Sequence, residues 1–337
     1  MLKYIVKRLA YAVLILVGVS LIIYFLIRMM PVDFIQSKID ALNQGGTVVD
    51  QAMVDAMYKA YGLEDTTGMN FGEKLASYFG GWAGWLGSML KGDLGTSFKY
   101  QIPVAQKIGE CMWLSFAVAL IATVFEFLIA IPLGITAATH QYSIRDYVVT
   151  VLVMIGISLP SFFFGNILKD LFALKLGWFP VSGMTDASKG YVGFELLMDN
   201  LWHMVIPIMT LVILSIGGRM RMTRTNMLEV MNSDYIRTAR AKGLKESVVI
   251  NKHAFRNTLI PLVTSLAGLL PSLFSGAIIT EQVFDLPGIG NVALSAMNAG
   301  DIPFIMGYNM FLAVLSVLGI LLADLMYGIV DPRVKLS

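Results

Sequence analysis

Three ionisable side chains inside or beside apolar segments are the ones most able to do chemistry. Glu126 lies within an otherwise uncharged stretch, His203 begins another, and Asp324 follows twenty apolar residues. An intramembrane enzyme would need these groups to converge. Their expected depths disfavour it, because Glu126 falls at mid-bilayer, Asp324 at the inner interface and His203 at the outer interface. This enzyme is kept as an alternative of a different class.

The sequence pattern supports neither a metal site nor a catalytic nucleophile. His, Cys, Asp and Glu nowhere have the spacing of metal ligands, and no nucleophile has a base in a plausible relation to it. The single cysteine, Cys111, cannot form an internal disulfide and is expected to be a small packing residue. We therefore expect no catalytic residue, no metal site and no cofactor in this chain.

The position of Glu126 in the membrane restricts its surroundings. A lone carboxylate in mid-membrane costs about 2.5–3.5 kcal/mol on insertion scales, so it should face the bundle interior or be protonated. Two interpretations remain open. Glu126 lines a pathway, or it is a structural partner for a Ser, Thr or Arg of another helix.

Composition places the chain in a membrane. Hydrophobic residues make up 56% of its 337 residues, charged ones only 14%, and its mean hydropathy is +0.70. The net charge of +2 is segregated by loop, which argues against nucleic acid as a partner. Six segments are long and apolar enough to cross about 30 Å of hydrocarbon: Leu9–Ile27, Met112–Ala138, Tyr147–Leu168, Leu201–Gly218, Leu259–Thr280 and Phe304–Ala323.

The stretch from Arg219 to Pro261 sets the orientation, since it holds nine Lys and Arg between two of these segments. With both termini cytoplasmic, fifteen of the 25 Lys and Arg residues face the cytoplasm, as the positive-inside rule requires. The predicted organisation is an N-terminal anchor helix (1–30), an extracytoplasmic subdomain (31–110) and a transmembrane core (111–337) containing the loop 219–261.

Small residues four apart predict close helix packing. Ser115, Ala119 and Thr123 form one such series, and Ala130, Gly134 and Ala138 form another. Small side chains at this spacing let neighbouring membrane helices approach closely.

The loop itself should fold into two short helices. Ser233 or Asp234 can cap the first helix, and Gly243 permits a sharp turn after it. A second helix then leads into the next span. Such a knob could seat in a cleft of a cytoplasmic protein by helix-in-groove packing. The apolar stripe of the first helix comprises Ile236, Ala239, Ala241 and Leu244.

This loop resembles the coupling loop of ATP-binding-cassette (ABC) importer permeases of the dipeptide and oligopeptide branch (DppB/OppB-like). The similar string runs from Ser233 to Leu244 and continues through His253–Asn257 to Leu259–Pro261. Further similar stretches, in matching order, are Gly92–Ser97, Lys175–Gly183, Glu281–Gly290 and Tyr327–Arg333.

The chain also departs from the general importer pattern. Arg237-Thr238-Ala239 stands where that signature reads Glu-Ala-Ala, and Gly243 precedes Pro261 by a longer interval than in sugar importers. Both features are similar to the peptide branch. Pro31-Val32-Asp33-Phe34 replaces the family's Pro-Gly-Asp-Pro, so the role of that corner is open.

The resemblance implies an all-α membrane protein of six transmembrane helices, the type I ABC importer permease fold. It implies a bacterial or archaeal cytoplasmic (inner) membrane and four partners: a second homologous permease, two ABC ATPase subunits and an extracytoplasmic substrate-binding protein. The sequence lacks a Gly-x-x-x-x-Gly-Lys-Ser/Thr phosphate loop. ATP and Mg²⁺ would therefore bind to the ATPase subunits.

The resemblance further implies an ATPase-docking surface and a cargo. The docking residues are Tyr235, Ile236, Arg237, Thr238, Ala239, Arg240, Ala241, Lys242, Gly243 and Leu244. Peptides are the first choice of cargo, with oligosaccharide, glutathione and nickel chelate as alternatives. A membrane assembly factor is the remaining alternative, although it would not need such a knob.

Overall fold

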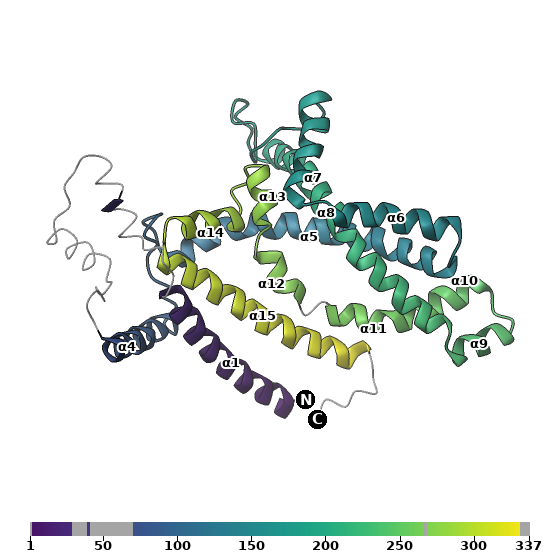
Figure 1. Cartoon of the computed structure of the whole chain (residues 1–337), viewed down its shortest axis with the longest axis horizontal. Helices are drawn as coiled ribbons and strands as arrows, with labels where there is room; N and C mark the ends of the chain where they lie inside the picture. Colours follow the sequence, from purple (N-terminus) through teal and green to yellow (C-terminus); the bar gives the residue numbers. More distant parts are fainter. Residues whose placement is uncertain (1, 29–38, 41–69, 266–267, 331–337) are drawn as a thin grey trace. The chain divides into compact units, whose positions relative to one another are not determined.

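The structure is a computed structural model that describes residues 2–28, 39–40, 70–265 and 268–330. Two compact units are formed, Met1–Trp113 with Val292–Val317 (unit one) and Leu114–Asn291 with Leu318–Ser337 (unit two). The described residues are mostly helical, which confirms the predicted all-α class (Figure 1). The corner Pro31–Phe34 and residues 41–69 of the predicted subdomain lie outside the described residues.

The helices follow one another along the chain, and the longest connection that the structure describes, residues 176–193, joins η1 to α8. Their bounds are α1 (Leu2–Arg28), α4 (Phe71–Met89), α5 (Val104–Thr139), α6 (Ile144–Ser158), α7 (Ser161–Leu168), η1 (Lys169–Lys175), α8 (Phe194–Met231), α9 (Asp234–Ala241), α10 (Glu246–Val248), η2 (Val249–Ala254), α11 (Phe255–Ser265), α12 (Leu269–Phe274), α13 (Ile278–Val283), α14 (Ile289–Asn298) and α15 (Ile302–Val330).

In unit one, α4 packs on α1 through aromatic side chains. Trp82 Nε1 donates a hydrogen bond to Ser20 Oγ at 3.1 Å. The start of α4 is fixed by a capping box, in which Asn70 Oδ1 accepts from the Glu73 backbone N–H and Glu73 Oε2 accepts from that of Asn70. The apolar cluster of this unit joins α1 to the start of α15, and Tyr78, Trp82 and Trp85 of α4 pack against it. Its buried members are Tyr24, Ile27, Phe98, Ile302, Ile305 and Met306.

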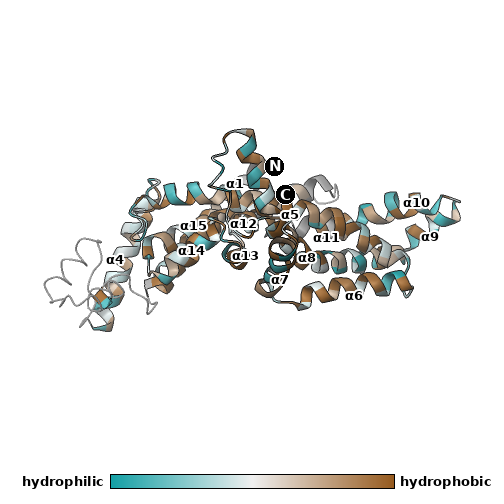
Figure 2. Ribbon diagram, turned by 90° about the horizontal axis from the view of Figure 1, so that it is seen from above, coloured by the Kyte–Doolittle hydropathy of each residue, from teal (hydrophilic) through white to brown (hydrophobic). Residues whose placement is uncertain are grey.

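In unit two, small residues let α5 and α8 approach closely. Ala130 and Ala137 of α5 are fully buried beside Met220 of α8. A Cβ on Gly134 would lie 2.7 Å from the Cβ of Thr223 and 2.8 Å from the Met220 carbonyl oxygen. The predicted close packing along this series of small residues is confirmed. Apolar residues dominate α6, which lies along α8 (Figure 2).

Among the described residues, four helices are long and apolar enough to cross a membrane, at Lys7–Ile27, Val104–Thr139, Phe194–Met231 and Ile302–Asp324. Taken together, α6 and α7–η1 are also long and apolar enough to cross a membrane, but the chain bends by 104° between them. Pro160 explains the break, because it cannot continue the helical hydrogen bonds and it holds Leu159 in an extended conformation (φ −90°, ψ 134°).

The fifth predicted span, Leu259–Thr280, is divided among α11, α12 and the start of α13. The count of six crossings therefore stays a prediction.

The basic loop begins later than its charges indicate. Although Arg219 was predicted to open the loop, α8 continues past Gly218 to Met231. The sequence from Arg219 to Met231 has neither Gly nor Pro, so nothing interrupts the helical hydrogen bonds. The first turn comes at Asn232 and Ser233.

The close approach of α5 and α8 can be tested at Gly134. Replacing it with Ala should destabilise the protein by about 1–3 kcal/mol, because the added methyl would push against the Thr223 side chain and the α8 backbone. Thermal unfolding of the detergent-purified variant measures the loss. Gly109→Ala is the matched control on α5, since a Cβ there meets nothing within 4 Å. Equal stability of the two variants would contradict this packing.

Candidate functional site

A helical knob, residues 233–254, follows directly on the end of α8 (Figure 1). It contains α9, a turn, α10 and η2. Ile236 and Ala239 of α9 point inward, with exposed fractions of 0% and 6%, and join a cluster with Val249, Ala254 and Met227 of α8. The knob is therefore packed onto the helix that carries it.

Gly243 makes the turn between the helices of the knob. Its φ of +72° lies in the left-handed region, where a residue with a Cβ is strained. A Cβ at this position would meet no neighbour within 4 Å. The predicted sharp turn is confirmed, and its requirement is for backbone conformation alone.

The outer face of the knob is exposed over most of the predicted docking residues. Tyr235 is 46% exposed and the Arg237 side chain is 74% exposed. Of the predicted apolar stripe, Ile236 and Ala239 face inward, whereas Leu244 is 40% exposed. The remaining exposed members are Thr238, Arg240, Ala241, Lys242 and Gly243.

An ion pair closes the knob across its turn. Arg240 Nη2 lies 2.7 Å from Glu246 Oε1, and Arg240 Nε lies 3.2 Å from Glu246 Oε2. These hydrogen bonds from the guanidinium hold the pKa of Glu246 below its ordinary value. The same pairing raises the pKa of Arg240.

Glu126 is held by an arginine of the neighbouring helix. Arg219 Nε of α8 donates to Glu126 Oε1 at 3.0 Å, and the two side chains are only 18% and 11% exposed. The Arg219 guanidinium also lies 4.4 Å from the centre of the Phe127 ring. Arg219 is thus a partner on another helix, as one of the two interpretations expected, and the lining of a pathway by Glu126 stays a prediction.

A second ion pair lies farther along α8. Arg224 donates to both carboxylate oxygens of Asp146 on α6, at 2.9 and 2.8 Å. Asp146 also accepts the backbone N–H of Tyr142 at 3.1 Å. Asp146 was not predicted from the sequence, although a carboxylate next to an apolar span is a usable signal.

Two further buried carboxylates, neither of them predicted from the sequence, organise loops of the chain. In unit two, Glu281 is 3% exposed and accepts from Ser115 Oγ at 2.6 Å. It also accepts backbone N–H groups from Ala277 and Asn291, at 3.1 and 2.8 Å. Ser115 Oγ in turn accepts the N–H of Ile289.

In unit one, Asp301 is fully buried and has an equivalent role. It accepts the Ser97 hydroxyl and the backbone N–H groups of Phe98 and Lys99. The Gly92–Ser97 and Glu281–Gly290 stretches noted in the sequence thus each contain or adjoin one of these carboxylate centres.

His203 and Glu126 are each engaged separately. His203 Nδ1 lies 2.8 Å from the carbonyl oxygen of Asp199, one turn earlier in α8. No cluster of three or more His, Cys, Asp or Glu residues suited to a metal occurs in the part of the chain that the structure describes.

Comparison with known sequences identifies the chain over its whole length. The family described as "Binding-protein-dependent transport system inner membrane component" matches residues 130–336, and a model of the N-terminal part of such proteins matches residues 1–119. The chain is 34% identical over 336 residues to the oligopeptide transport system permease protein AppB of Bacillus subtilis, covering 99% of this chain and 100% of AppB.

Another relative is the dipeptide transport system permease protein DppB of Escherichia coli K12, which is 32% identical, with 99% of each chain covered. Among solved structures, the MetNI methionine ABC transporter in inward facing conformations is similar in fold, with a TM-score of 0.50 at 16% identity, covering 67% of this chain and 97% of that one. Matched over more than half its length by one family and along its full length by relatives above 30% identity, the chain belongs to the inner-membrane permease components of binding-protein-dependent ABC transport systems.

Proposed function

We propose that this chain forms half of the membrane pathway of an ATP-driven peptide importer and that its knob is where the motor acts. The observation that supports the proposal is the exposed outer face of α9, set on the end of a helix that traverses the membrane region without a break. A surface of this kind transmits movement from a cytoplasmic partner into the bundle.

The partners follow from this role. We assign the other half of the pathway to a second homologous permease, ATP hydrolysis to two ABC ATPase subunits that bind ATP and Mg²⁺, and substrate delivery to an extracytoplasmic binding protein. The docking surface consists of the exposed residues between Tyr235 and Leu244. Ile236 and Ala239 would support that surface from inside the knob.

The orientation follows from the same docking. We place both termini and the 219–261 region on the cytoplasmic side, where nine Lys and Arg satisfy the positive-inside rule. Peptides are the proposed cargo, because AppB and DppB are named as oligopeptide and dipeptide permeases. Oligosaccharide, glutathione and nickel chelate are the alternatives that a binding assay must separate.

Mechanically, closure of the ATPases on ATP would displace the knob, and α8 would follow because its apolar cluster joins the two. The Glu126–Arg219 and Asp146–Arg224 pairs would pass that displacement to α5 and α6.

The turn of the knob gives the first test. Gly243→Leu forces a branched side chain into a left-handed conformation, at a cost of about 1–2 kcal/mol, and should abolish ATP-driven uptake while the protein still inserts. Peptide uptake into vesicles and the amount of inserted protein are measured together. Gly177→Leu is the matched control, because Gly177 also has a positive φ (+63°) and open space. Normal uptake by the Gly243→Leu protein would rule out docking through this turn.

Cross-linking tests docking and orientation together. Thr238→Cys introduces an exposed thiol on α9, whereas the natural Cys111 is buried. We expect this thiol to form a disulfide or short bismaleimide adduct with an ATPase subunit and to resist a membrane-impermeant maleimide added outside intact cells. Lys189→Cys is the control, because this exposed residue is expected outside and should react. Labelling of position 238 from outside the cell would overturn both the docking to the ATPase and the cytoplasmic location of α9.

The ion pair across the turn predicts a pH dependence. Because Arg240 lowers the folded-state pKa of Glu246, the pair stabilises the knob at neutral pH, and this contribution is lost as pH falls through that lowered pKa. Both side chains are partly exposed, so Glu246→Gln should cost no more than about 1 kcal/mol at pH 7. Hydrogen exchange of α9 should rise in the variant at pH 7 but match the parent at low pH. A difference that persists at low pH would contradict the pairing.

A further inference from the structure

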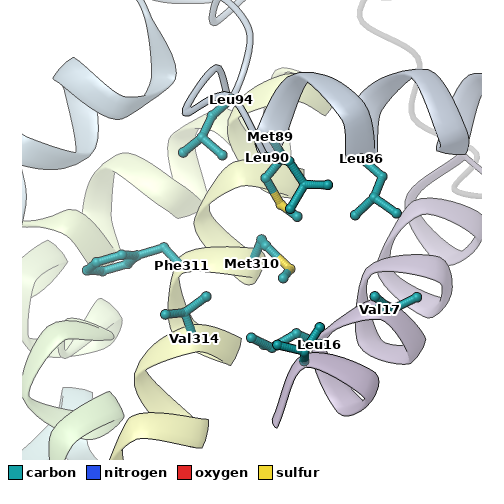
Figure 3. A pocket seen from close by; sticks show the side chains of 10 residues that line it. Leu16, Val17, Leu86, Met89, Leu90, Leu94, Met310, Phe311 and Val314 are labelled. Atoms are coloured by element: carbon teal, nitrogen blue, oxygen red, sulfur yellow. The ribbon is translucent and has the colours of Figure 1, made fainter. Parts of the chain in front are cut away.

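A groove of about 390 Å³ lies within unit one, between α1, α4 and α15 (Figure 3). Val17 of α1, Leu86 of α4 and Met310 of α15 point into it from three sides. Met310 forms its floor at 4% exposure, and Val13 and Leu90 stand at its mouth at 61% and 79% exposure. Every residue of the lining is aliphatic, methionine or phenylalanine.

Two of the three helices that form the groove are apolar enough to span a membrane. The C-terminal part of α4 lies beside them, although the sequence assigned it to the extracytoplasmic subdomain (31–110). Lys7–Ile27 of α1 and Ile302–Asp324 of α15 are both long and apolar enough to cross a membrane, and the chain belongs to an inner-membrane family. The groove mouth at Val13 lies within the first of these segments. An exposed apolar groove at that level faces lipid tails and not water.

The lining favours one kind of occupant. It offers no side-chain hydrogen bond or charge, so an extended peptide placed there would leave its backbone polar groups unpaired. A helix is about 10–12 Å wide and rises 5.4 Å per turn, so about one turn would fill the whole volume. A flexible hydrocarbon chain has no polar backbone groups to leave unpaired, and it is thinner than a helix.

The size also fits. The groove is within the range of about 300–1,000 Å³ typical of ligand sites. It is more than twice the roughly 150 Å³ of a dry apolar cavity that holds benzene. Empty, it would forfeit the dispersion contacts of three helices.

We propose that this groove binds one acyl chain of a bilayer phospholipid, which packs between α1, α4 and α15. The site is separate from the knob and does not depend on the identity of the transported molecule. The bound chain fills the space beneath α4 and fixes this helix, which has no fully buried residue of its own, against α1.

Photolabelling in a bilayer tests the site. The transporter, purified with its associated subunits, is reconstituted with phosphatidylethanolamine carrying a diazirine near the end of one acyl chain. After irradiation, peptides are mapped by mass spectrometry. We expect labelled residues on α4 near Leu86 and Leu90 and on α15 near Met310, above the labelling of the exposed α6 residues Val148, Val151 and Leu152.

Two variants on one helix provide the control. Val17→Trp fills the groove and should abolish labelling of α4 and α15. Leu14→Trp adds the same ring to a 69%-exposed position outside the lining and should leave the labelling intact. Unchanged labelling in Val17→Trp would overturn the proposal.

The parent protein alone also tests the site, should Val17→Trp fail to accumulate. Labelling of the groove peptides no stronger than that of α6 would show ordinary bilayer contact and would contradict a bound chain. A disulfide from Val13→Cys to a second membrane subunit would assign the groove to protein and would contradict it equally.

Discussion

Two ion pairs inside unit two hold the central helix, and the position of the knob depends on them. Arg219 and Arg224 of α8 each meet a carboxylate on a different neighbour, Glu126 on α5 and Asp146 on α6. Removing one partner of such a pair leaves a charge without compensation, which typically costs about 3–5 kcal/mol. The geometry is therefore strongly specified, and α8 meets the knob as a helix fixed against two others.

The knob divides its residues between two tasks. Its inward side chains are small or branched and pack on Met227, whereas its outer side chains are mostly polar, aromatic or basic, with Ala241 and Leu244 as apolar exceptions. This division suits a part that must remain attached to its own helix while it contacts another protein. The apolar groove in unit one shows the opposite surface chemistry, which supports our proposal that it faces lipid.

Much of this architecture could be predicted because it is local. Apolar length predicted the spans that run through α1, α5, α8 and α15, and Gly243 predicted the turn within the knob. The small residues of α5 predicted close packing, since a helix face repeats every three to four residues. Charge counting was less exact about boundaries, because it assigned Arg219 to a loop although no residue there stops the helix.

Contacts between distant segments could not be predicted in this way. Glu281 meets a serine 166 positions earlier in the chain, and Asp301 meets one 204 positions earlier, so neither periodicity nor spacing could pair them. The size of the bend after α6 could not be predicted for a related reason. A proline in a membrane segment is compatible with a kink or a break, and only the packing of the neighbours decides which forms.

The setting of Glu281 explains the composition of the loop around it. Its carboxylate approaches three glycines so closely that a Cβ on Gly276, Gly288 or Gly290 would lie within 3.0 Å of one of its oxygens. The glycines of this stretch thus leave room for one carboxylate and for no additional side chain. Because each carboxylate oxygen of Glu281 accepts a backbone N–H, a glutamine there would turn its NH2 group toward one of these donors. A side chain added to any of the three glycines would displace the carboxylate and weaken the link of this loop to Ser115.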